Sequence, residues 1–552
     1  MPQLSGAQSV INSLKQGGVH YVFGIPGGVI LPLYDVLYEE SQPAHLLVRH
    51  EETAAFMADA YARVTGQPQV CLGTMGPGAQ NLLIGVACAY SDSIPLLAIT
   101  GNVSTAYEGR GLQQETDHVG IFNPVTIWGL KVTRTDRIPE IMRKAFRMAT
   151  LGRPGPVLLD FPVDVLTQEA EMNPMRPMNM PPAMGRLLGD LDHIKTAAQL
   201  MMHAEQPLIL TGGGVISANA SDLLTKLAES LQTPVVTSYN GRGSIPEDHP
   251  LFLGRAGSGA PKIFDQIIRE ADVVLAIGYR FTDVSTNNWN FPSDNTLIIQ
   301  VDIDPYEIER IFPVEIGIIG DARTVLTKLL EYTQLHTGSN HRRKDWVRAS
   351  FQLKNEWERQ MTVKMTSSAL PIKPHRVMKE LRDLLDRDAI IATTAGNNKM
   401  FVASLFKIFE PRTWIHSGGS TPMGAAFCHA LGAQLAAPQR QVVAVCGDGG
   451  FQMVCQDLIT AVENDLPVIT CILNDQSLGL IRYQQKKQYK GRIFATEFQQ
   501  FPDFVKLAEA FGATGIRVEK PADIKPALQQ AIKLDCPVVL DIIIDKDESP
   551  QL

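Results

Sequence analysis

Glycines and carboxylates that could hold a diphosphate and a magnesium ion follow two apolar runs near the C-terminal end of the chain. Residues 442–446 lead into the turn Gly-Asp-Gly-Gly at 447–450, and residues 468–473 lead into Asn-Asp at 474–475. Glycines let a phosphate approach the backbone closely, and carboxylate oxygens are ligands that Mg²⁺ prefers. The glycine turn alone would also fit a tight strand-to-helix turn with Asp448 as the helix N-cap.

These residues need two parallel strands joined by a crossover helix to bring them together. Both apolar runs have the length of buried strands, and the segment between them has the periodicity of an amphipathic helix. Ligands of open α/β sheets bind at the carboxyl ends of such strands. The turns at 447–450 and 474–475 are therefore expected at one edge of a single sheet.

The same alternation of apolar strands and helices recurs in three parts of the chain. It runs over residues 1–167, 189–335 and 371–552. Between these parts lie residues 168–188, whose prolines predict an extended connector, and a polar helical stretch at 336–370. We therefore predict an α/β protein with three doubly wound parallel-sheet domains and two linkers.

The composition is that of an ordinary globular protein and argues against several classes of function. Of 552 residues, 45% are hydrophobic and 20% are charged, and the net charge is -8 without a basic run, so we expect no nucleic-acid partner. No apolar run approaches the length that crosses a bilayer, and residues 1–18 lack a secretory-signal pattern. The seven scattered cysteines form no CxxC pair, which is typical of reduced cysteines in a cytoplasmic protein.

Asp448 and Asp475, at this spacing, resemble the signature of enzymes that use thiamine diphosphate (ThDP). Residues 24–37, residues 74–102 and the Arg-His-Glu sequence at 49–51 are similar to segments of one such family, the catalytic subunits of acetolactate synthase. The resemblance covers nearly the whole chain. It implies a pyrimidine-binding first domain, a central domain of the FAD-binding type, and a third domain that binds the diphosphate and Mg²⁺.

The resemblance implies roles for individual side chains. Glu51 would exchange a proton with the pyrimidine ring of the cofactor and so activate it, although a carboxylate there could also serve only the helix dipole. Gln114 would lie beside the reacting carbon, and Gln113 is the neighbour with which it could be confused. Met423 would support a bent cofactor, unless it serves only in packing.

The resemblance also implies the metal ligands and the cofactor contacts. Asp448, Asp475 and a backbone carbonyl near Ser477 would hold Mg²⁺. With Glu51 and Met423, the expected ThDP contacts are Pro26, Gly27, Gly28, Thr74, Gly76, Asn81, Gly396, Asn397, Asn398, Gly418, Gly447, Asp448, Gly449, Gly450, Asp475, Ser477, Leu478, Gly479 and Leu480.

Segments of the second domain resemble those with which biosynthetic acetolactate synthases and pyruvate oxidases hold FAD. A glycine triplet follows one strand, and arginines and aspartates follow others. The expected FAD contacts are Gly212, Gly213, Gly214, Arg255, Gly278, Arg280, Asp302, Asp304 and Asp321. The alternative is a retained fold whose site is empty or differently filled, because glycines also serve turns.

Several positions depart from the biosynthetic pattern of this family. Gln484 replaces a tryptophan that favours 2-oxobutanoate as acceptor. Without this aromatic side chain, the preference for the extra methylene of 2-oxobutanoate over pyruvate would weaken by about 1 to 3 kcal/mol. Ile127 replaces a lysine, and the chain ends at Leu552 without a tail that would cover the site. Asp475 replaces the usual second asparagine, as in the catabolic branch. Arg482 would meet the acceptor carboxylate or lie exposed on the surface.

Taken together, the resemblance implies an acetolactate synthase that decarboxylates pyruvate and transfers the two-carbon unit to a second pyruvate, giving 2-acetolactate. It implies a homodimer or dimer of dimers, because the family pairs complementary halves of the site between subunits, with a regulatory subunit as a further partner. The alternatives are another ThDP-dependent 2-oxo acid decarboxylase, oxidase or acyltransferase, a flavin or nicotinamide oxidoreductase, and an inactive binding protein.

Overall fold

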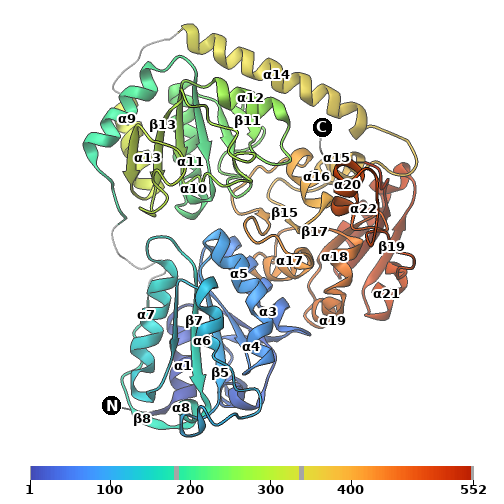
Figure 1. The fold of residues 1–552 in the computed structure, drawn as a ribbon. Coiled ribbons are helices and arrows are strands. Elements are labelled where there is room, and N and C mark those ends of the chain that lie inside the picture. The colour runs from blue at the N-terminus through green and yellow to red at the C-terminus, as the bar shows by residue number, and fades with distance from the viewer. Residues whose placement is uncertain (1, 179–185, 335–340, 549–552) are drawn as a thin grey trace.

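Three six-stranded parallel sheets follow one another along the chain and form the framework of the protein (Figure 1). The structure, a computed structural model, describes residues 2–178, 186–334 and 341–548. Alternate residues of a strand enter different hydrophobic clusters: in β5 (Leu96–Asn102), Leu96 and Ala98 belong to one cluster, and Leu97 and Ile99 to another. Each sheet is therefore covered on both faces, and the predicted α/β fold with three doubly wound domains is confirmed.

The first domain has the strand order β3-β2-β4-β5-β7-β6. Its other strands are β2 (Tyr21–Gly24), β3 (Ala44–Leu47), β4 (Gln69–Gly73), β6 (Trp128–Lys131) and β7 (Pro156–Pro162). Its helices are α1 (Gly6–Gln16), α2 (Leu31–Glu39), α3 (Glu51–Thr65), α4 (Pro77–Asn81), α5 (Leu83–Asp92), α6 (His118–Phe122), α7 (Ile138–Thr150) and α8 (Val163–Thr167).

The central domain has the strand order β11-β10-β9-β12-β13-β14. Its strands are β9 (Pro207–Thr211), β10 (Val235–Thr237), β11 (Phe252–Arg255), β12 (Val273–Ile277), β13 (Leu297–Asp302) and β14 (Ile316–Ile319). Its helices are α9 (Leu191–His203), α10 (Gly213–Ser217), α11 (Ser221–Leu231), α12 (Lys262–Glu270) and α13 (Ala322–Gln334).

The third domain has the strand order β16-β15-β17-β18-β20-β19. Its strands are β15 (Ile390–Thr393), β16 (Trp414–Ile415), β17 (Val442–Gly447), β18 (Ile469–Asn474), β19 (Thr514–Val518) and β20 (Val538–Ile543). Its helices are α15 (Pro374–Leu384), α16 (Asn397–Leu405), α17 (Ala425–Ala436), α18 (Asp448–Gln452), α19 (Leu458–Glu463), α20 (Gly479–Gln488), α21 (Phe504–Ala510) and α22 (Pro521–Lys533).

All three sheets reverse their winding direction at one point, and part of each predicted site lies in the loops that follow the two strands flanking this point. The reversal lies between β2 and β4, between β9 and β12, and between β15 and β17. Two adjacent loops leave in opposite directions there and open a crevice at the carboxyl ends of the strands. Strand order thus places each set of predicted contacts where open α/β sheets bind ligands.

The first and third domains share one hydrophobic core. Helices α3 and α17 pack against each other, and one buried cluster contains Ala54 and Ala58 of α3 with Ala426 and Ala430 of α17 (Figure 1). Small residues allow the close approach: a Cβ on Gly432 would lie 2.2 Å from the backbone oxygen of Met57. These two domains are therefore held in a fixed mutual arrangement within the chain.

The two segments between the domains take different forms. Part of residues 168–188 forms β8 (Glu169–Glu171), which pairs antiparallel with β1 (Gln3–Ser5), and Met175 is buried against the first domain. Residues 179–185 of the predicted connector lie outside the described residues. Within 336–370, helix α14 (His341–Met365) runs from the central domain to the third domain (Figure 1).

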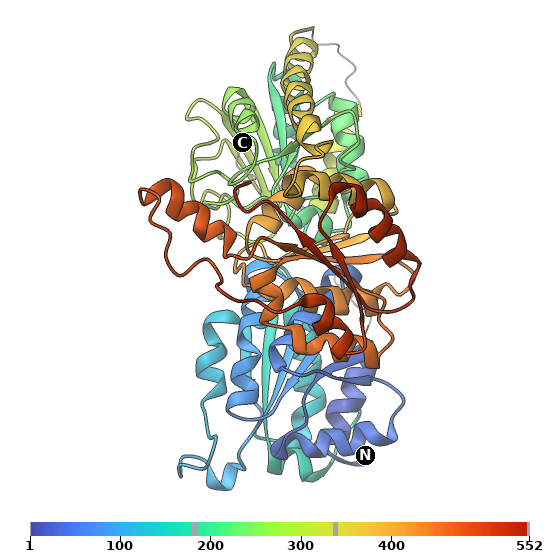
Figure 2. The same ribbon diagram turned by 90° about the vertical axis from the view of Figure 1, so that its right-hand side faces the viewer.

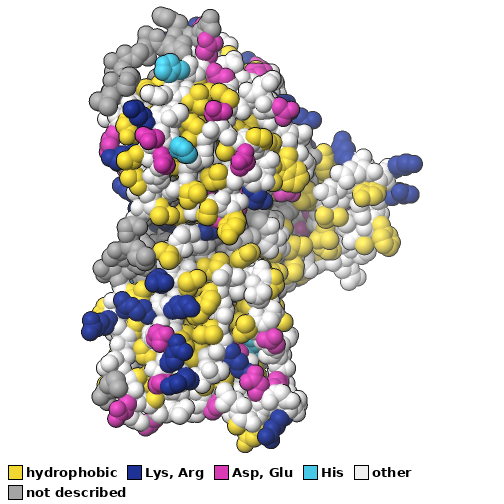
Figure 3. Space-filling model, turned by 60° about the vertical axis from the view of Figure 1, so that its left-hand side comes forward, with side chains coloured by type: hydrophobic (Ala, Val, Ile, Leu, Met, Phe, Trp, Pro, Cys, Tyr) yellow, Lys and Arg dark blue, Asp and Glu magenta, His cyan; other side chains and the backbone are white. Residues whose placement is uncertain are grey.

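The surface carries both charge signs. On the face shown in Figure 3, Lys and Arg side chains lie among Asp, Glu and hydrophobic side chains. Within the part of the chain that the structure describes, no helix combines the length and apolarity that a membrane span requires.

Candidate cofactor-binding sites

Glu51 is the first residue of α3, next to the crevice between β2 and β4. Only 8% of its surface is exposed, and its Oε2 accepts a hydrogen bond of 3.0 Å from Asn81 Nδ2. A Cβ on Gly78 would lie 3.1 Å from Glu51 Oε1, so the glycine keeps space beside this oxygen. Asn81 therefore fixes the carboxylate through one oxygen.

The loops after β2 and β4 touch each other beside Glu51. A Cβ on Gly27 would lie 2.4 Å from the Thr74 side chain, whereas a Cβ on Gly28 would meet nothing within 4 Å. Gly27 is thus required by close packing, and Gly28 faces open space that a ligand could fill. The predicted contacts Pro26, Gly27, Gly28, Thr74, Gly76 and Asn81 all belong to these loops or to α4.

Gln114 packs against Gly76, in the loop after β4 that borders the crevice beside Glu51. The sequence alone did not predict this contact. Gly76 has φ +61°, and a Cβ on it would lie 2.8 Å from the backbone oxygen of Gln114. The Gly76 N–H donates to Nε2 of His118 at 3.0 Å, and His118 Nδ1 lies 2.8 Å from Asp160 Oδ1. Since a backbone N–H can only donate, Nε2 accepts and Nδ1 carries the proton.

His118 and Asp160 were missed because they act on the site through a backbone group. Both side chains are fully buried, and Asp160 also accepts hydrogen bonds from Thr100 Oγ1 at 2.8 Å and Asn102 Nδ2 at 2.6 Å. The sequence signal that could have found Asp160 was a carboxylate within the apolar strand β7, and His118 at the start of α6 carried no such signal.

Asp448 and Asp475 lie at the crevice beside β17, close enough for the negative charge of Asp475 to act on Asp448. Asp448 is 1% exposed, its Oδ1 accepts from Gly449 N at 2.9 Å, and among the described residues its Oδ2 has no partner. Burial, with the charge of Asp475, raises the pKa of Asp448 to about 7. Burial also raises the pKa of Asp475 to about 6, although Ser477 N and Oγ both donate to it at 3.0 Å.

The two carboxylates fit a divalent cation. A cation would neutralise the repulsion between them and give the free oxygen of Asp448 a ligand role. A Cβ on Gly479 would lie 2.2 Å from Asp475 Oδ2, so this glycine keeps the carboxylate accessible. Among the described residues no group of three or more His, Cys, Asp or Glu could hold a metal, so further ligands would come from a backbone carbonyl and from a diphosphate.

The neighbouring loop after β15 supplies amides to the same crevice. Asn398 Nδ2 donates to the backbone oxygens of Thr394 and Val445, both at 3.2 Å, and so ties the loop to β17. In the described part of the chain, the buried Asn397 Oδ1 has no hydrogen-bond partner. The predicted contacts brought together at these loops are Gly396, Asn397, Asn398, Gly447, Asp448, Gly449, Gly450, Asp475, Ser477, Leu478, Gly479 and Leu480.

Two of the predicted ThDP contacts have other surroundings. Gly418 donates its N–H to Asp92 at 2.7 Å and lines the central cavity described below. Met423 precedes Gly424, which has φ +85° and lies near Val454. Within residues 2–178, 186–334 and 341–548, no hydrogen bond or ion pair joins Glu51 to Asp448 or Asp475.

Arg482 lies at the base of α20, which stands out from the third domain (Figure 2). It is only 6% exposed, and its guanidinium contacts Glu497 Oε1 at 2.8 Å and Asp547 Oδ1 at 3.0 Å. Arg482 is therefore buried and already paired with two carboxylates. Gln484, on the same helix, is exposed, and Ile127 packs 2.7 Å from where a Cβ on Gly155 would lie.

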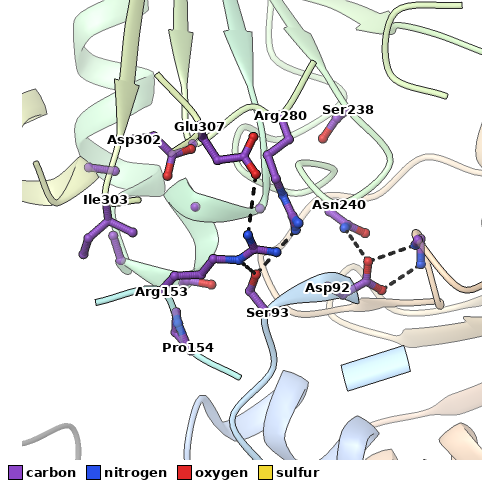
Figure 4. A pocket seen from close by; sticks show the side chains of 18 of the residues that line it. Asp92, Ser93, Arg153, Pro154, Ser238, Asn240, Arg280, Asp302, Ile303 and Glu307 are labelled. Atoms are coloured by element: carbon purple, nitrogen blue, oxygen red, sulfur yellow. Dashed lines mark hydrogen bonds and ion pairs between the residues drawn. The ribbon is translucent and has the colours of Figure 1, made fainter. Parts of the chain in front are cut away.

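A cavity of about 730 Å³ opens between β9 and β12 at the junction of the three domains (Figure 4). Arg280 and Arg153 point into it, and both lie near Ser93 Oγ, at 3.5 and 2.9 Å. Arg153 also lies 3.5 Å from Glu307. Burial raises the pKa of Asp302, at the end of β13, to about 6.

Most of the predicted FAD contacts line this cavity, but not all. Gly213, Gly214, Gly278, Arg280, Asp302 and Asp321 do so. Gly212 instead packs on the neighbouring loop, since a Cβ on it would lie 1.9 Å from Gly278 O. Asp304 pairs with Arg153 at 3.2 Å, and Arg255 lies over the Tyr239 ring and lines a different cavity.

The chemistry of the central cavity fits a large anionic nucleotide. Three arginines, Arg153, Arg186 and Arg280, could meet phosphates, and Asp302 could accept hydroxyl hydrogen bonds. The volume lies within the range of sites for drug-sized ligands and cofactors. Sequence reasoning missed Asp92, Ser93 and Arg153 here, because they come from the first domain and reach the cavity only through tertiary packing.

Comparison with known protein families agrees with this architecture. Models of thiamine pyrophosphate (ThDP) enzymes match the chain in order: the N-terminal TPP binding domain at residues 4–121, the central domain at 194–329, and the C-terminal TPP binding domain at 394–542. Three domains of this kind, with glycine-lined crevices at their sheet edges, define a ThDP enzyme.

Comparison with curated proteins shows which family of ThDP enzymes the chain resembles. A probable acetolactate synthase large subunit of Methanocaldococcus jannaschii is 40% identical over 99% of this chain and 93% of its own length. The isozyme 3 large subunit of Escherichia coli is 38% identical (99% and 96%), as is the large subunit of Corynebacterium glutamicum (99% and 87%). The chain belongs to the acetolactate synthase large-subunit family, and it is an enzyme.

Proposed function

We propose that this enzyme makes 2-acetolactate from two molecules of pyruvate, with ThDP and Mg²⁺ as cofactors. The observation that carries the proposal is the pair of crevices in the first and third domains. One contains the anchored carboxylate of Glu51, and the other contains two carboxylates, Asp448 and Asp475, whose raised pKa values and mutual charge fit a divalent cation. Relatives of 38–40% identity along the whole chain carry the name acetolactate synthase.

Each group of residues has a chemical task in this proposal. Bound ThDP supplies a nucleophilic carbon and an electron sink for decarboxylation. Glu51 would exchange a proton with the pyrimidine ring through the oxygen that Asn81 does not bind, and Asp448, Asp475 and a carbonyl near Ser477 would hold Mg²⁺. Gln114 orients the substrate, and His118 holds the Gly76 turn against which Gln114 rests.

We further infer that the central cavity holds FAD and that the assembly is a homodimer or dimer of dimers in the cytoplasm. The arginines and Asp302 of the cavity support FAD. Within the described residues of one chain, no hydrogen bond or ion pair joins Glu51 to Asp448 or Asp475, and this supports a site completed by a second copy. Relatives named as large subunits support a smaller regulatory partner.

A second candidate is another ThDP-dependent reaction of 2-oxo acids, such as simple decarboxylation or oxidation. It is favoured by Ile127, which packs on Gly155 and brings no charge, and by Arg482, whose guanidinium already contacts two carboxylates. Product analysis separates the two. The enzyme with ThDP, Mg²⁺ and pyruvate should form acetolactate as its main product, whereas mainly acetaldehyde, or acetate with peroxide, would favour the second candidate.

Replacement of Glu51 tests the catalytic assignment. Glu51→Gln keeps the shape and the Asn81 contact but removes the proton acceptor, so exchange of the C2 proton of bound ThDP should slow by about 10² to 10⁴. The exchange is measured by proton NMR after acid quench. Glu52→Gln, which changes the neighbouring half-buried carboxylate, is the matched control, and in this variant the C2 proton of bound ThDP should exchange at the rate of the unaltered enzyme. Equal rates in both variants would remove the role of Glu51.

A further inference from the structure

A second cavity lies apart from the cofactor crevices, where the central domain meets α14 and the third domain. It has a volume of about 260 Å³ and is bordered by β11, α12, α14 and the C-terminal end of α16. Figure 1 shows α14 passing over β11 and α12 towards the third domain. We call it the Arg255 cavity. Its walls are mainly apolar: Phe252, Leu253, Phe264, Trp357, Met361, Met365, Leu405 and Phe406.

Arg255 brings a buried charge to this cavity: its guanidinium lies over the Tyr239 ring, 3.9 Å from the centroid, and forms no ion pair among the described residues. The residue is 3% exposed, and its Nη1 donates to the backbone oxygens of Ala256 and Ser258, both at 3.1 Å. In the described structure its Nε and Nη2 have no hydrogen-bond partner. A buried guanidinium with unsatisfied donors costs free energy, and an anion at this point would remove that cost.

The other charged groups at the cavity also favour an anion. Lys354 is 9% exposed and its Nζ donates to the backbone oxygen of Phe252 at 2.6 Å. Arg242 is satisfied by Glu247, with two contacts of 2.7 Å, and Lys407 lies 3.5 Å from Glu358. Both carboxylates of the lining are thus paired, and in the described part of the chain neither Arg255 nor Lys354 forms an ion pair.

The apolar walls restrict what kind of anion fits. Phe264 and Trp357 stand edge to face with ring centroids 6.0 Å apart, and Met361 and Met365 offer adaptable thioether surface. The Trp357 Nε1 hydrogen, buried and without a partner among the described residues, is a further donor. Inorganic phosphate has no hydrocarbon part and would make no contact with these apolar side chains. The volume falls just below the usual range for drug-sized ligands, which favours a small molecule.

We propose that the Arg255 cavity binds a small organic monocarboxylate, with its carboxylate on Arg255 and Lys354 and its hydrocarbon part between Phe264, Trp357 and Met361. The cavity is separate from the proposed catalytic groups, since it lies at the C-terminal end of α16 whereas Asn397 lies at the other end. The proposal does not depend on which reaction the enzyme catalyses.

Calorimetric titration of the enzyme loaded with ThDP and Mg²⁺ tests this proposal. Phenylacetate should bind saturably, and the neutral phenylacetamide and inorganic phosphate should bind much more weakly or not at all. Arg255→Met should weaken phenylacetate binding by about tenfold or more, because a charge-assisted hydrogen bond is lost. Arg269→Met, which removes an exposed guanidinium from α12, is the matched control and should bind like the unaltered enzyme.

A second variant locates the binding and guards against misfolding. Met365→Trp fills the cavity without removing a charge and should also weaken phenylacetate binding, while thermal unfolding reports whether each variant is folded. The proposal is overturned if phenylacetate does not bind, if phosphate binds as tightly, or if a folded Arg255→Met or Met365→Trp variant binds phenylacetate as the unaltered enzyme does.

Discussion

Three carboxylates at the proposed cofactor sites are largely shielded from water and form no ion pair among the described residues. The pKa values of Asp448, Asp475 and Asp302 are raised to about 7, 6 and 6, in each case chiefly because burial disfavours the ionised form. By contrast Asp92, which is equally buried, contacts Arg63 at 2.9 Å and its pKa is held below the usual range. The fold thus bears an electrostatic cost at the sites where a cofactor or metal would relieve it.

Asp302→Asn should stabilise the flavin-free protein in a pH-dependent manner. The folded-state pKa of about 6 lies above the unfolded value near 3.9, so the burial cost of the carboxylate is complete above pH 6 and absent below pH 4. The variant should therefore gain on the order of 2–3 kcal/mol at pH 8 and clearly less at pH 5. Calorimetric melting at both pH values measures this gain, and a change of equal size at both would contradict it.

Short local motifs, together with the family resemblance, were sufficient to single out Glu51, Asp448 and Asp475 as site candidates, and their roles in catalysis and metal binding stay predictions. Contacts made by backbone groups and by distant segments were not predictable in this way. His118 acts on the Gly76 N–H, and Arg153 enters a cavity of another domain. The placement of Arg255 in a different cavity from the proposed FAD site follows from the direction of its side chain at the end of β11, which no sequence pattern specifies.

Short elements set the geometry of the first-domain crevice. Helix α4 is only five residues long and begins after Gly76, whose positive φ turns the chain from β4 towards Glu51. The strands that frame the crevice were predictable from apolar runs. The hydrogen bond between Gly76 and His118 was not, because it joins segments that are far apart in the sequence.

Gly76→Ala tests whether this turn positions Gln114. A Cβ at φ +61° costs about 1 kcal/mol and would lie 2.8 Å from Gln114 O, so the variant should lose some stability and about tenfold or more in kcat/KM. Gly18→Ala is matched, since Gly18 has φ +76° with nothing within 4 Å of its Cβ position. It should lose similar stability and no activity. Equal activity losses in both variants would show that strain alone, and not the contact with Gln114, matters.

At the scale of the whole molecule, one buried network ties the three domains together. Asp92 of the first domain accepts a hydrogen bond from Asn240 of the central domain at 2.9 Å (Figure 4). It also accepts one from the Gly418 N–H of the third domain at 2.7 Å. The number of domains and their α/β class were predictable from the alternation of elements. The strand order, and with it the position of each crevice, was not, because the local pattern of a strand does not specify its neighbours.

The division of the proposed active site between two copies of the chain can be tested by mixing inactive variants. Glu51→Gln disables the first-domain half and Asp448→Asn disables the metal-binding half. If each site combines the first domain of one copy with the third domain of another, a hybrid dimer of the two variants contains one intact site. Random assembly makes half of the dimers hybrids, so the mixture should recover about a quarter of the full activity.

Each variant alone should remain inactive, as should a mixture of Glu51→Gln with a chain that carries both changes. If every site lies within one chain, no mixture regains activity, and the measured rate after co-expression and co-purification decides between the two arrangements.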